Sequence, residues 1–459
     1  MKQTRFLLVG LLVITSITTK ANVSLPAVFA DHMVLQQQSD VKIWGWGKPL
    51  EEVKLKAGWS ADTLKTVVNN QGKWSVQIQT PKAGGPYEIT IQGYNLLTLK
   101  DILIGEVWLL SGQSNMEWTT RGGIIGKEEA VKEADLPNIR LFTVTPRTAL
   151  NPTHDVSGEW NVCTPETMLD FSSVGYFFGK KLQKNLDVPI GMICSSWGGT
   201  PVEVWMPEEV LEADSQLITS AKSLKPVPWG PVEPGRAFNA MIAPMMPFQF
   251  AGVLWYQGEA NTANPSTYTA MLQTMIKSWR AGFEKDLPFY FAQIAPWNGY
   301  GGTSGVEIRE AQRKALSLAK TGMVMTSDIG DTIDIHPRNK KDVGLRFANL
   351  ALNQTYGKTD LPIYGPQYSS YQVKGTKVTV LFDHADGLNV KGDALSLFEV
   401  KDQNGEWHKT KAKIRKNTVV LGSKVKEPVA VRFAWTNAAT PGLFNSDNLP
   451  ASCFNTDMP

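Results

Sequence analysis

Small polar residues and glycines follow several apolar runs in the middle of the chain, and a histidine follows the last of them. Ser114 comes shortly after the run Val107–Leu110, and His336 lies near the far end of the same region. A serine hydroxyl is a weak nucleophile unless a base takes its proton, and an imidazole with an ordinary pKa near ~6.5 suits that role. These residue types predict nucleophilic catalysis by Ser114 with His336 as the general base.

Such a pair needs a carboxylate that fixes the histidine tautomer and steadies the imidazolium. Asp334 is the acid nearest to His336 in the sequence, with Asp331 and Asp328 before it. Asp334 is therefore the first candidate for this position.

Acyl transfer also needs donors for the oxyanion of a tetrahedral intermediate. The N–H of Ser114 would lie at a helix N-terminus, where unpaired donors favour negative charge. A glycine after the second apolar run offers another backbone N–H, and Gln257 or Asn261 could add a side-chain N–H. Together with the serine and the histidine, these groups form a complete set for acyl transfer.

Each of these residues also has a structural interpretation. Gly198 and Gly199 fit a simple turn, Asp331 and Asp334 fit an Asx-turn and a helix cap, and Glu259 fits a surface or capping carboxylate. The residue pattern alone therefore leaves two interpretations open, a hydrolase site and a set of residues with only structural roles.

Continuous apolar runs alternate with helical patterns in the region that carries these residues. The five runs, typical of buried parallel strands, are Val107–Leu110, Ile190–Cys194, Val253–Tyr256, Phe289–Ile294 and Met323–Thr326. Helical stripes lie around Val174–Leu182, Tyr268–Trp279, Ile308–Leu318 and Val343–Leu350, with Ser172 or Ser173 as a candidate N-cap. This alternation predicts a doubly wound α/β domain, which binds ligands beyond the carboxyl ends of its strands.

The flanking regions, residues 22–105 and 365–459, show the period-two alternation of β-strands. Thr66–Gln79 is predicted to form a hairpin with its turn at residues 69–72. The flanks are either two small modules or the two halves of one sandwich.

Residues 1–21 are predicted to be a signal peptide. Lys2 and Arg5 precede the apolar run Phe6–Ile14, and small residues at Thr19 and Ala21 fit a cleavage site. The run is too short to span a bilayer. We expect a periplasmic or secreted protein without membrane insertion.

Composition excludes several classes of protein. With 42% hydrophobic and 19% charged residues, the chain is not disordered, and without residues 1–21 it carries 43 basic and 43 acidic side chains. That balance gives no reason to expect a nucleic-acid partner. The three cysteines form no disulfide framework, and no His or Cys spacing indicates a metal site, so no metal or cofactor is expected.

Four motifs resemble the sialate O-acetylesterase family, a carbohydrate-esterase branch of the SGNH hydrolases. They are Gly112–Glu117 (GQSNME), Trp197–Thr200 (WGGT), Trp255–Asn261 (WYQGEAN) and Asp334–Pro337 (DIHP). The segments Leu25–Gln36 and Leu443–Asp457 also resemble that family's termini. The likeness covers essentially the whole chain after residue 21.

The resemblance implies a flavodoxin-like SGNH-hydrolase α/β/α sandwich over residues 106–360. It also implies a β-sandwich built from the N- and C-terminal segments, residues 22–105 and 361–459.

The resemblance also implies roles for single residues. Ser114 matches the nucleophile and His336 the base. The N–H groups of Ser114 and Gly199 match the oxyanion donors, with Gln257 near the third donor. Glu259 matches a position that orders the site or holds substrate.

The acid departs from the pattern of many SGNH enzymes, which place it three residues before the histidine. Ile333 occupies that position here, and Asp334 lies two residues before His336. Asp334 either completes a triad, or a Ser–His dyad operates with support from a backbone carbonyl.

The implied activity is a serine esterase that removes O-acetyl groups from a carbohydrate, foremost 9-O-acetylated sialic acid, without a cofactor. The alternatives are an acetyl esterase on a neutral plant glycan such as acetylated xylan, or an inactive carbohydrate-binding protein. The sequence leaves the oligomeric state open. Side chains near strand ends that could hold the sugar or its carboxylate are Trp118, Trp197, Trp255, Trp297, Asn261, Arg121, Arg236, Arg309 and Arg338.

Overall fold

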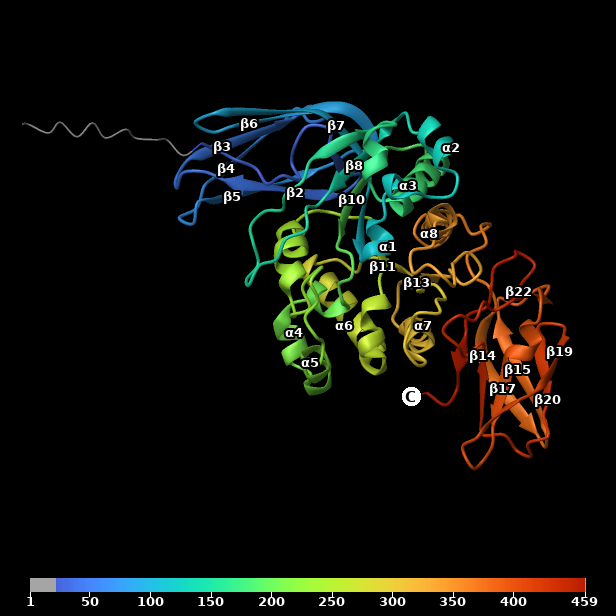
Figure 1. Cartoon of the computed structure of the whole chain (residues 1–459). Helices are drawn as coiled ribbons and strands as arrows, with labels where there is room; N and C mark the ends of the chain where they lie inside the picture. The colour runs from blue at the N-terminus through green and yellow to red at the C-terminus, as the bar shows by residue number, and fades with distance from the viewer. Residues whose placement is uncertain (1–21, 459) are drawn as a thin grey trace, which may run out of the picture.

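A computed structural model gives the structure of residues 22–458. The predicted signal peptide, residues 1–21, lies outside the described residues and stays a prediction. A β-rich region, an α/β region and a second β-rich region follow one another along the chain (Figure 1). Within residues 22–458, no helix has the length and apolar character that crossing a membrane requires.

The α/β region is built on a central sheet with the strand order β13-β12-β11-β7-β10-β8-β9. All neighbours in this order are parallel except β8 and β9. The strands are β7 (Leu96–Gly112), β8 (Leu136–Thr143), β9 (Trp160–Cys163), β10 (Ile190–Ser196), β11 (Gly252–Tyr256), β12 (Phe289–Ala292) and β13 (Thr321–Val324). The five predicted strands are confirmed, whereas β8 was missed because Asn138 and Arg140 interrupt its apolar residues.

Helices cover both faces of this sheet, as the α/β/α prediction requires. On one face, α3 (Ser173–Leu186) and α8 (Lys340–Gln354) share a buried core with the strand residue Leu110. On the other face, α6 (Tyr268–Gly282) and α7 (Ser304–Ala315) share a core with Leu109. The predicted cap of α3 is present, since Ser172 Oγ accepts a hydrogen bond from Gly175 N at 3.1 Å. The shorter helices are α1 (Ser114–Glu117), α2 (Lys127–Lys132), α4 (Glu208–Glu212) and α5 (Ser215–Lys222).

Strands of the N-terminal region join this sheet through the long strand β7. Its first half pairs with β6 and β1, and its second half pairs with β10 and β11. The other strands here are β1 (Val34–Gln36), β2 (Asp40–Trp46), β3 (Glu52–Ala57), β4 (Thr63–Val67), β5 (Lys73–Gln79) and β6 (Gly84–Gln92). The boundary expected at residue 105 therefore lies inside one continuous strand.

The predicted hairpin over Thr66–Gln79 is wrong in its pairing. The turn exists, with Gly72 N donating to Asn69 O at 3.0 Å, but β4 pairs with β3 and β5 pairs with β2. Alternation of apolar residues predicts which face of a strand is buried, and it does not identify the neighbouring strand.

The C-terminal region forms a separate β-module. Its strands pair only with one another, in the orders β14-β15-β20-β19, β18-β17-β21-β23 and β16-β22, around their own core. They are β14 (Gln367–Lys374), β15 (Lys377–Asp383), β16 (Asn389–Val390), β17 (Phe398–Lys401), β18 (Trp407–Lys409), β19 (Lys411–Arg415), β20 (Thr418–Gly422), β21 (Ala430–Phe433), β22 (Leu443–Phe444) and β23 (Phe454–Asn455).

The β-sandwich expected from both chain ends is therefore corrected to two modules. Figure 1 shows the N-terminal strands and the C-terminal strands on different sides of the α/β region. Both segments alternate with the same period, so the sequence pattern does not distinguish one shared sandwich from two separate modules.

Candidate active site

Ser114 lies where β7 ends and α1 begins, at the carboxyl end of the central sheet. Gly112 permits this turn, since its φ is +134° and a Cβ there would lie 2.2 Å from Tyr256 O on β11. Ser114 is half-buried and is the first residue of the helix. Its N–H belongs to the first turn, whose amides have no acceptor inside the helix.

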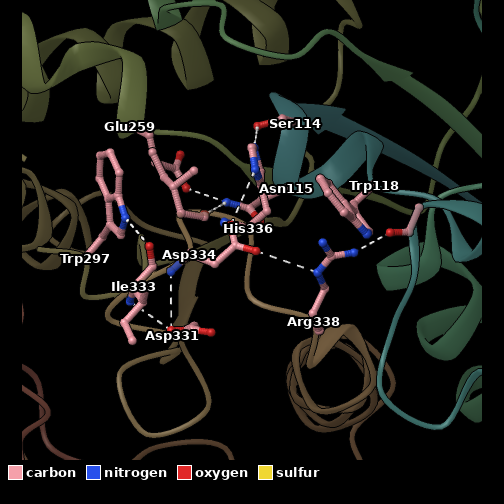
Figure 2. Close-up of polar contacts among 12 residues, drawn as sticks. Ser114, Asn115, Trp118, Glu259, Trp297, Asp331, Ile333, Asp334, His336 and Arg338 are labelled. Atoms are coloured by element: carbon pink, nitrogen blue, oxygen red, sulfur yellow. Dashed lines mark hydrogen bonds and ion pairs between the residues drawn. The ribbon is translucent and has the colours of Figure 1, made fainter. Parts of the chain in front are cut away.

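His336 reaches Ser114 from the loop that follows β13. His336 Nε2 and Ser114 Oγ are 2.8 Å apart and form a hydrogen bond. Trp118 stacks on the imidazole with ring centroids 4.8 Å apart (Figure 2). Ser114 and His336 are thus held at a distance at which a proton can pass from the hydroxyl to the imidazole.

Asp334 lies beside His336 but bonds to its backbone. Asp334 Oδ1 accepts a hydrogen bond from His336 N at 2.8 Å, whereas the distance to the ring Nδ1 is 3.9 Å. The second distance is too long for a hydrogen bond. Arg338 Nε lies 3.7 Å from the other carboxylate oxygen. This geometry favours a Ser–His dyad with a nearby negative charge over a hydrogen-bonded triad.

The two glycines after β10 differ in what their N–H groups contact. Gly198 N donates to Glu117 Oε2 at 2.6 Å. Gly199, with a φ of +72°, has no acceptor for its N–H among residues 22–458. A Cβ at Gly198 would lie 3.3 Å from Ser114 Cβ, so this loop passes directly against the serine. The free amide of Gly199 fits the expected oxyanion donor, and Glu117 holds the loop that presents it.

Gln257 and Asn261 belong to a buried network behind the site. Both side chains are completely buried, and Gln257 Nε2 donates to Thr200 O at 3.2 Å and to Asn261 Oδ1 at 2.8 Å. Asn261 Nδ2 donates to Glu203 Oε2 at 2.8 Å. Because the amide groups are already bonded inside the protein, this geometry does not favour the expected roles as oxyanion donors. It favours support of the loop after β10 instead.

Glu259 takes part in a second buried network that reaches the neighbours of Ser114 and His336. Asn115, the neighbour of Ser114, donates from Nδ2 to Glu259 Oε1 at 2.7 Å and to Ile335 O at 3.1 Å. Lys340 Nζ donates to Asn115 Oδ1. Burial raises the pKa of Glu259 and lowers the pKa of Lys340 to about 7. The network ties the serine turn to the residue before His336, so Glu259 fits the expected ordering role.

The tryptophans near the strand ends have different surroundings. Trp255 is fully buried, so it packs in the core and does not face a substrate. Trp197 is half-buried and donates from Nε1 to Trp229 O at 3.0 Å. Trp297 donates from Nε1 to Ile333 O at 3.0 Å and thereby holds the loop that carries His336.

Three of the four candidate arginines have clear partners. Arg121 Nε lies 2.6 Å from Asp170 Oδ1 in a salt bridge. Arg309 is buried and donates to backbone carbonyls, including Ala439 O at 3.1 Å. The guanidinium of Arg338 lies 4.7 Å from the ring of Trp118 and is half-exposed beside His336. Of these three, Arg338 is the one that lies beside the Ser114–His336 pair.

Sequence reasoning missed the roles of Glu117, Asn115 and Lys340. The first two lie inside the serine motif, but residue spacing does not show where their side chains point. Lys340 gave no signal, because a lysine at the start of a helix is usually solvated.

The charges around His336 predict how the reaction responds to pH. Burial lowers its pKa, the cations of Lys340 and Arg338 lower it further, and Asp334 raises it. A general base must be neutral, so we expect activity to persist to a lower pH than an ordinary histidine allows. Lys340→Met removes a cation, so the pKa of His336 should rise and the acidic limb of kcat/KM should move to higher pH.

Lys341→Met is the matched control. Lys341 is adjacent in the sequence but exposed, and its Nζ lies 3.8 Å from Glu129 Oε2 on α2. Its profile should coincide with that of the wild type. An unchanged acidic limb in Lys340→Met, with the fold verified by circular dichroism, would contradict the assignment of Lys340.

Comparisons with known proteins identify a family for this chain. Residues 104–353 match the family described as carbohydrate esterase, sialic acid-specific acetylesterase. The chain is 28% identical to the sialate O-acetylesterase of Homo sapiens over 451 residues, covering 88% of this chain and 86% of that protein. For the sialate O-acetylesterase of Mus musculus, the identity is 28% and the coverage is 93% and 92%. The crystal structure of a carbohydrate acetylesterase from Xanthomonas citri is 34% identical, with a TM-score of 0.86, covering 95% of this chain and 100% of that one.

Proposed function

Since the chain belongs to the sialic acid-specific acetylesterase family of carbohydrate esterases and is a carboxylic-ester hydrolase, we propose that it removes O-acetyl groups from a sugar through an acetyl-Ser114 intermediate. The observation that carries this proposal is the 2.8 Å contact between Ser114 Oγ and His336 Nε2. The free amide of Gly199 beside Ser114 supports it.

In the proposed first half-reaction, Ser114 Oγ attacks the acetyl carbonyl carbon while His336 Nε2 takes the hydroxyl proton. The N–H groups of Ser114 and Gly199 stabilise the oxyanion. The intermediate then collapses, and His336 gives its proton to the departing sugar oxygen.

In the second half-reaction, water attacks the acetyl group on Ser114 and His336 takes a proton from that water. Collapse of the second intermediate releases acetate, and the proton returns to Ser114 Oγ. Each step uses the same pair of residues in opposite directions, so a separate acid is not required.

The position of Asp334 leads to a prediction for its charge. Asp334→Asn keeps an oxygen that can accept from His336 N, and no ring hydrogen bond is lost because the ring lies 3.9 Å away. We expect kcat to fall by less than about tenfold, compared with roughly 10⁴-fold where a carboxylate binds the imidazole directly. Asp334→Ala, which also removes the backbone acceptor, should lose more.

The measurement is kcat for p-nitrophenyl acetate in both variants at a pH where His336 is neutral. A loss of a thousandfold or more in Asp334→Asn, with an intact fold, would show that a triad operates.

As substrate we propose 9-O-acetylated sialic acid, whose carboxylate suits the half-exposed cation of Arg338 next to the catalytic histidine. A neutral glycan such as acetylated xylan would not use this cation, and it is the second candidate. Acetate release from the two substrates at equal ester concentration distinguishes them, and a preference for xylan would reverse the assignment.

Arg338→Gln adds a sharper test of the same assignment. We expect kcat/KM for the sialate to fall about tenfold or more relative to kcat/KM for xylan, because a charge-assisted hydrogen bond is lost. The comparison is made at pH 8, where the effect of Arg338 on the pKa of His336 does not matter. Equal losses on both substrates would count against a role in carboxylate recognition.

A further inference from the structure

An exposed tryptophan lies against Gly199, the proposed oxyanion donor. Trp229 belongs to the proline-rich segment of residues 222–235, and 60% of its surface is exposed. A tryptophan side chain combines a large apolar face with one N–H donor, and tryptophan is enriched at binding interfaces for that reason. None of the roles assigned above uses this side chain.

The indole of Trp229 occupies the space that a side chain at position 199 would fill. A Cβ on Gly199 would lie 2.2 Å from both Cδ1 and Nε1 of Trp229, so the pyrrole edge packs directly on this glycine. Nε1 has no acceptor among the described residues. It therefore remains available to an acceptor oxygen of a ligand, next to the free amide of Gly199.

The segment around Trp229 is fixed to the same loop at further points. An antiparallel bridge between Val227 and Gly230 forms a tight turn with Trp229 inside it. Trp197 Nε1 donates to Trp229 O at 3.0 Å, and a Cβ at Gly230 would lie 3.1 Å from Thr200 Cγ2. The backbone that carries the indole is thus held at a defined position, so little ordering of this segment is needed when a ligand binds.

We propose that Trp229 binds the sugar ring of the substrate. Its exposed face stacks on the apolar face of the ring, and Nε1–H is offered to a hydroxyl or ring oxygen, while the acetyl group reaches Ser114 and Gly199. This inference rests on the proposed function and deepens it, because it assigns recognition of the sugar, as distinct from the acetyl group, to Trp229.

The test compares an acetyl ester with a sugar and one without a ring. Acetate release from 9-O-acetylated N-acetylneuraminic acid, acetylated xylobiose and vinyl acetate is followed by pH titration. For Trp229→Ala we expect kcat/KM on the preferred sugar ester to fall about tenfold, mainly through KM, with vinyl acetate changed by less than about twofold. Trp229→Phe, which keeps a ring, should retain most of the activity on the sugar ester. Trp59→Ala is the control, because Trp59 lies in the N-terminal β-rich region, and it should leave the activity on the sugar ester and on vinyl acetate unchanged.

Two results would overturn the inference. Equal losses on the sugar ester and on vinyl acetate would mean that Trp229 only supports the Gly199 loop. Unchanged activity of Trp229→Ala on every substrate would mean that Trp229 binds no sugar. Failure of the proposed function itself is recognised separately, because vinyl acetate hydrolysis would then persist in Ser114→Ala.

Discussion

Ser114→Ala is expected to lower kcat by roughly 10⁴-fold or more while the protein keeps its fold. In the proposed mechanism the hydroxyl oxygen of Ser114 forms the bond to the acetyl carbon, and no neighbouring group would replace it. Its hydrogen bond to His336 joins two half-buried side chains at the surface of the site, and its loss should cost little stability. The buried networks of Asn115 and Gln257 behind the serine do not involve this oxygen.

The measurement is steady-state hydrolysis of p-nitrophenyl acetate by the wild type and the variant, with circular dichroism as a check of folding. Ser396→Ala in the C-terminal module is the matched control and should behave like the wild type. Residual turnover of a tenth or more in Ser114→Ala would exclude this serine as the nucleophile. A wild type that binds acetylated glycans without hydrolysing any ester would favour the carbohydrate-binding alternative.

His336→Ala is expected to lose activity to a similar extent, because the hydroxyl of Ser114 is then left without a base. When two residues act as one unit, the losses of activity from their single substitutions do not add. The double variant Ser114→Ala/His336→Ala should therefore be as active as the less active of the two single variants. This prediction distinguishes a functional pair from two residues that contribute independently.

His408→Ala is the control for this change. His408 Nε2 lies 2.7 Å from Asp402 Oδ2 in the C-terminal module, so this variant tests the loss of a histidine–carboxylate contact outside the α/β region. Turnover of His336→Ala within tenfold of the wild type would contradict the assignment of the base. A double variant whose loss equals the product of the two single losses would contradict the functional pair.

Much of the α/β region could be predicted from the sequence, because buried parallel strands read as continuous apolar runs. The rule that ligands bind beyond the carboxyl ends of such strands then placed Ser114 and His336 at one edge of the sheet. In the structure, Ser114 Oγ and His336 Nε2 lie 2.8 Å apart although the two residues are far apart in the sequence.

The pairing of the β-modules could not be predicted in the same way. Alternation in β4 and β5 indicated strands, but the partners β3 and β2 depend on contacts between distant segments. The same limit left one sandwich and two modules both open from the strand pattern, and the single sandwich was what the family resemblance implied. The continuity of β7 across the expected boundary also depends on pairing partners rather than on composition.

The supporting residues of the site depend on side-chain directions that spacing does not reveal. Asp334 is two residues before His336, yet the bend of the loop directs its carboxylate to the backbone N–H rather than to the ring. Lys340 is buried with its ammonium group donating to Asn115 Oδ1, and nothing in its local sequence indicates this.

Covalent labelling tests the central claim most directly. The wild type is treated with diethyl p-nitrophenyl phosphate, an organophosphate that reacts with activated serines, and the modified peptide is identified by mass spectrometry. We predict one diethylphosphoryl group on Ser114, formed in proportion to the activity lost and absent in His336→Ala. Loss of activity with Ser114 unmodified, or full activity with Ser114 modified, would contradict the proposed mechanism.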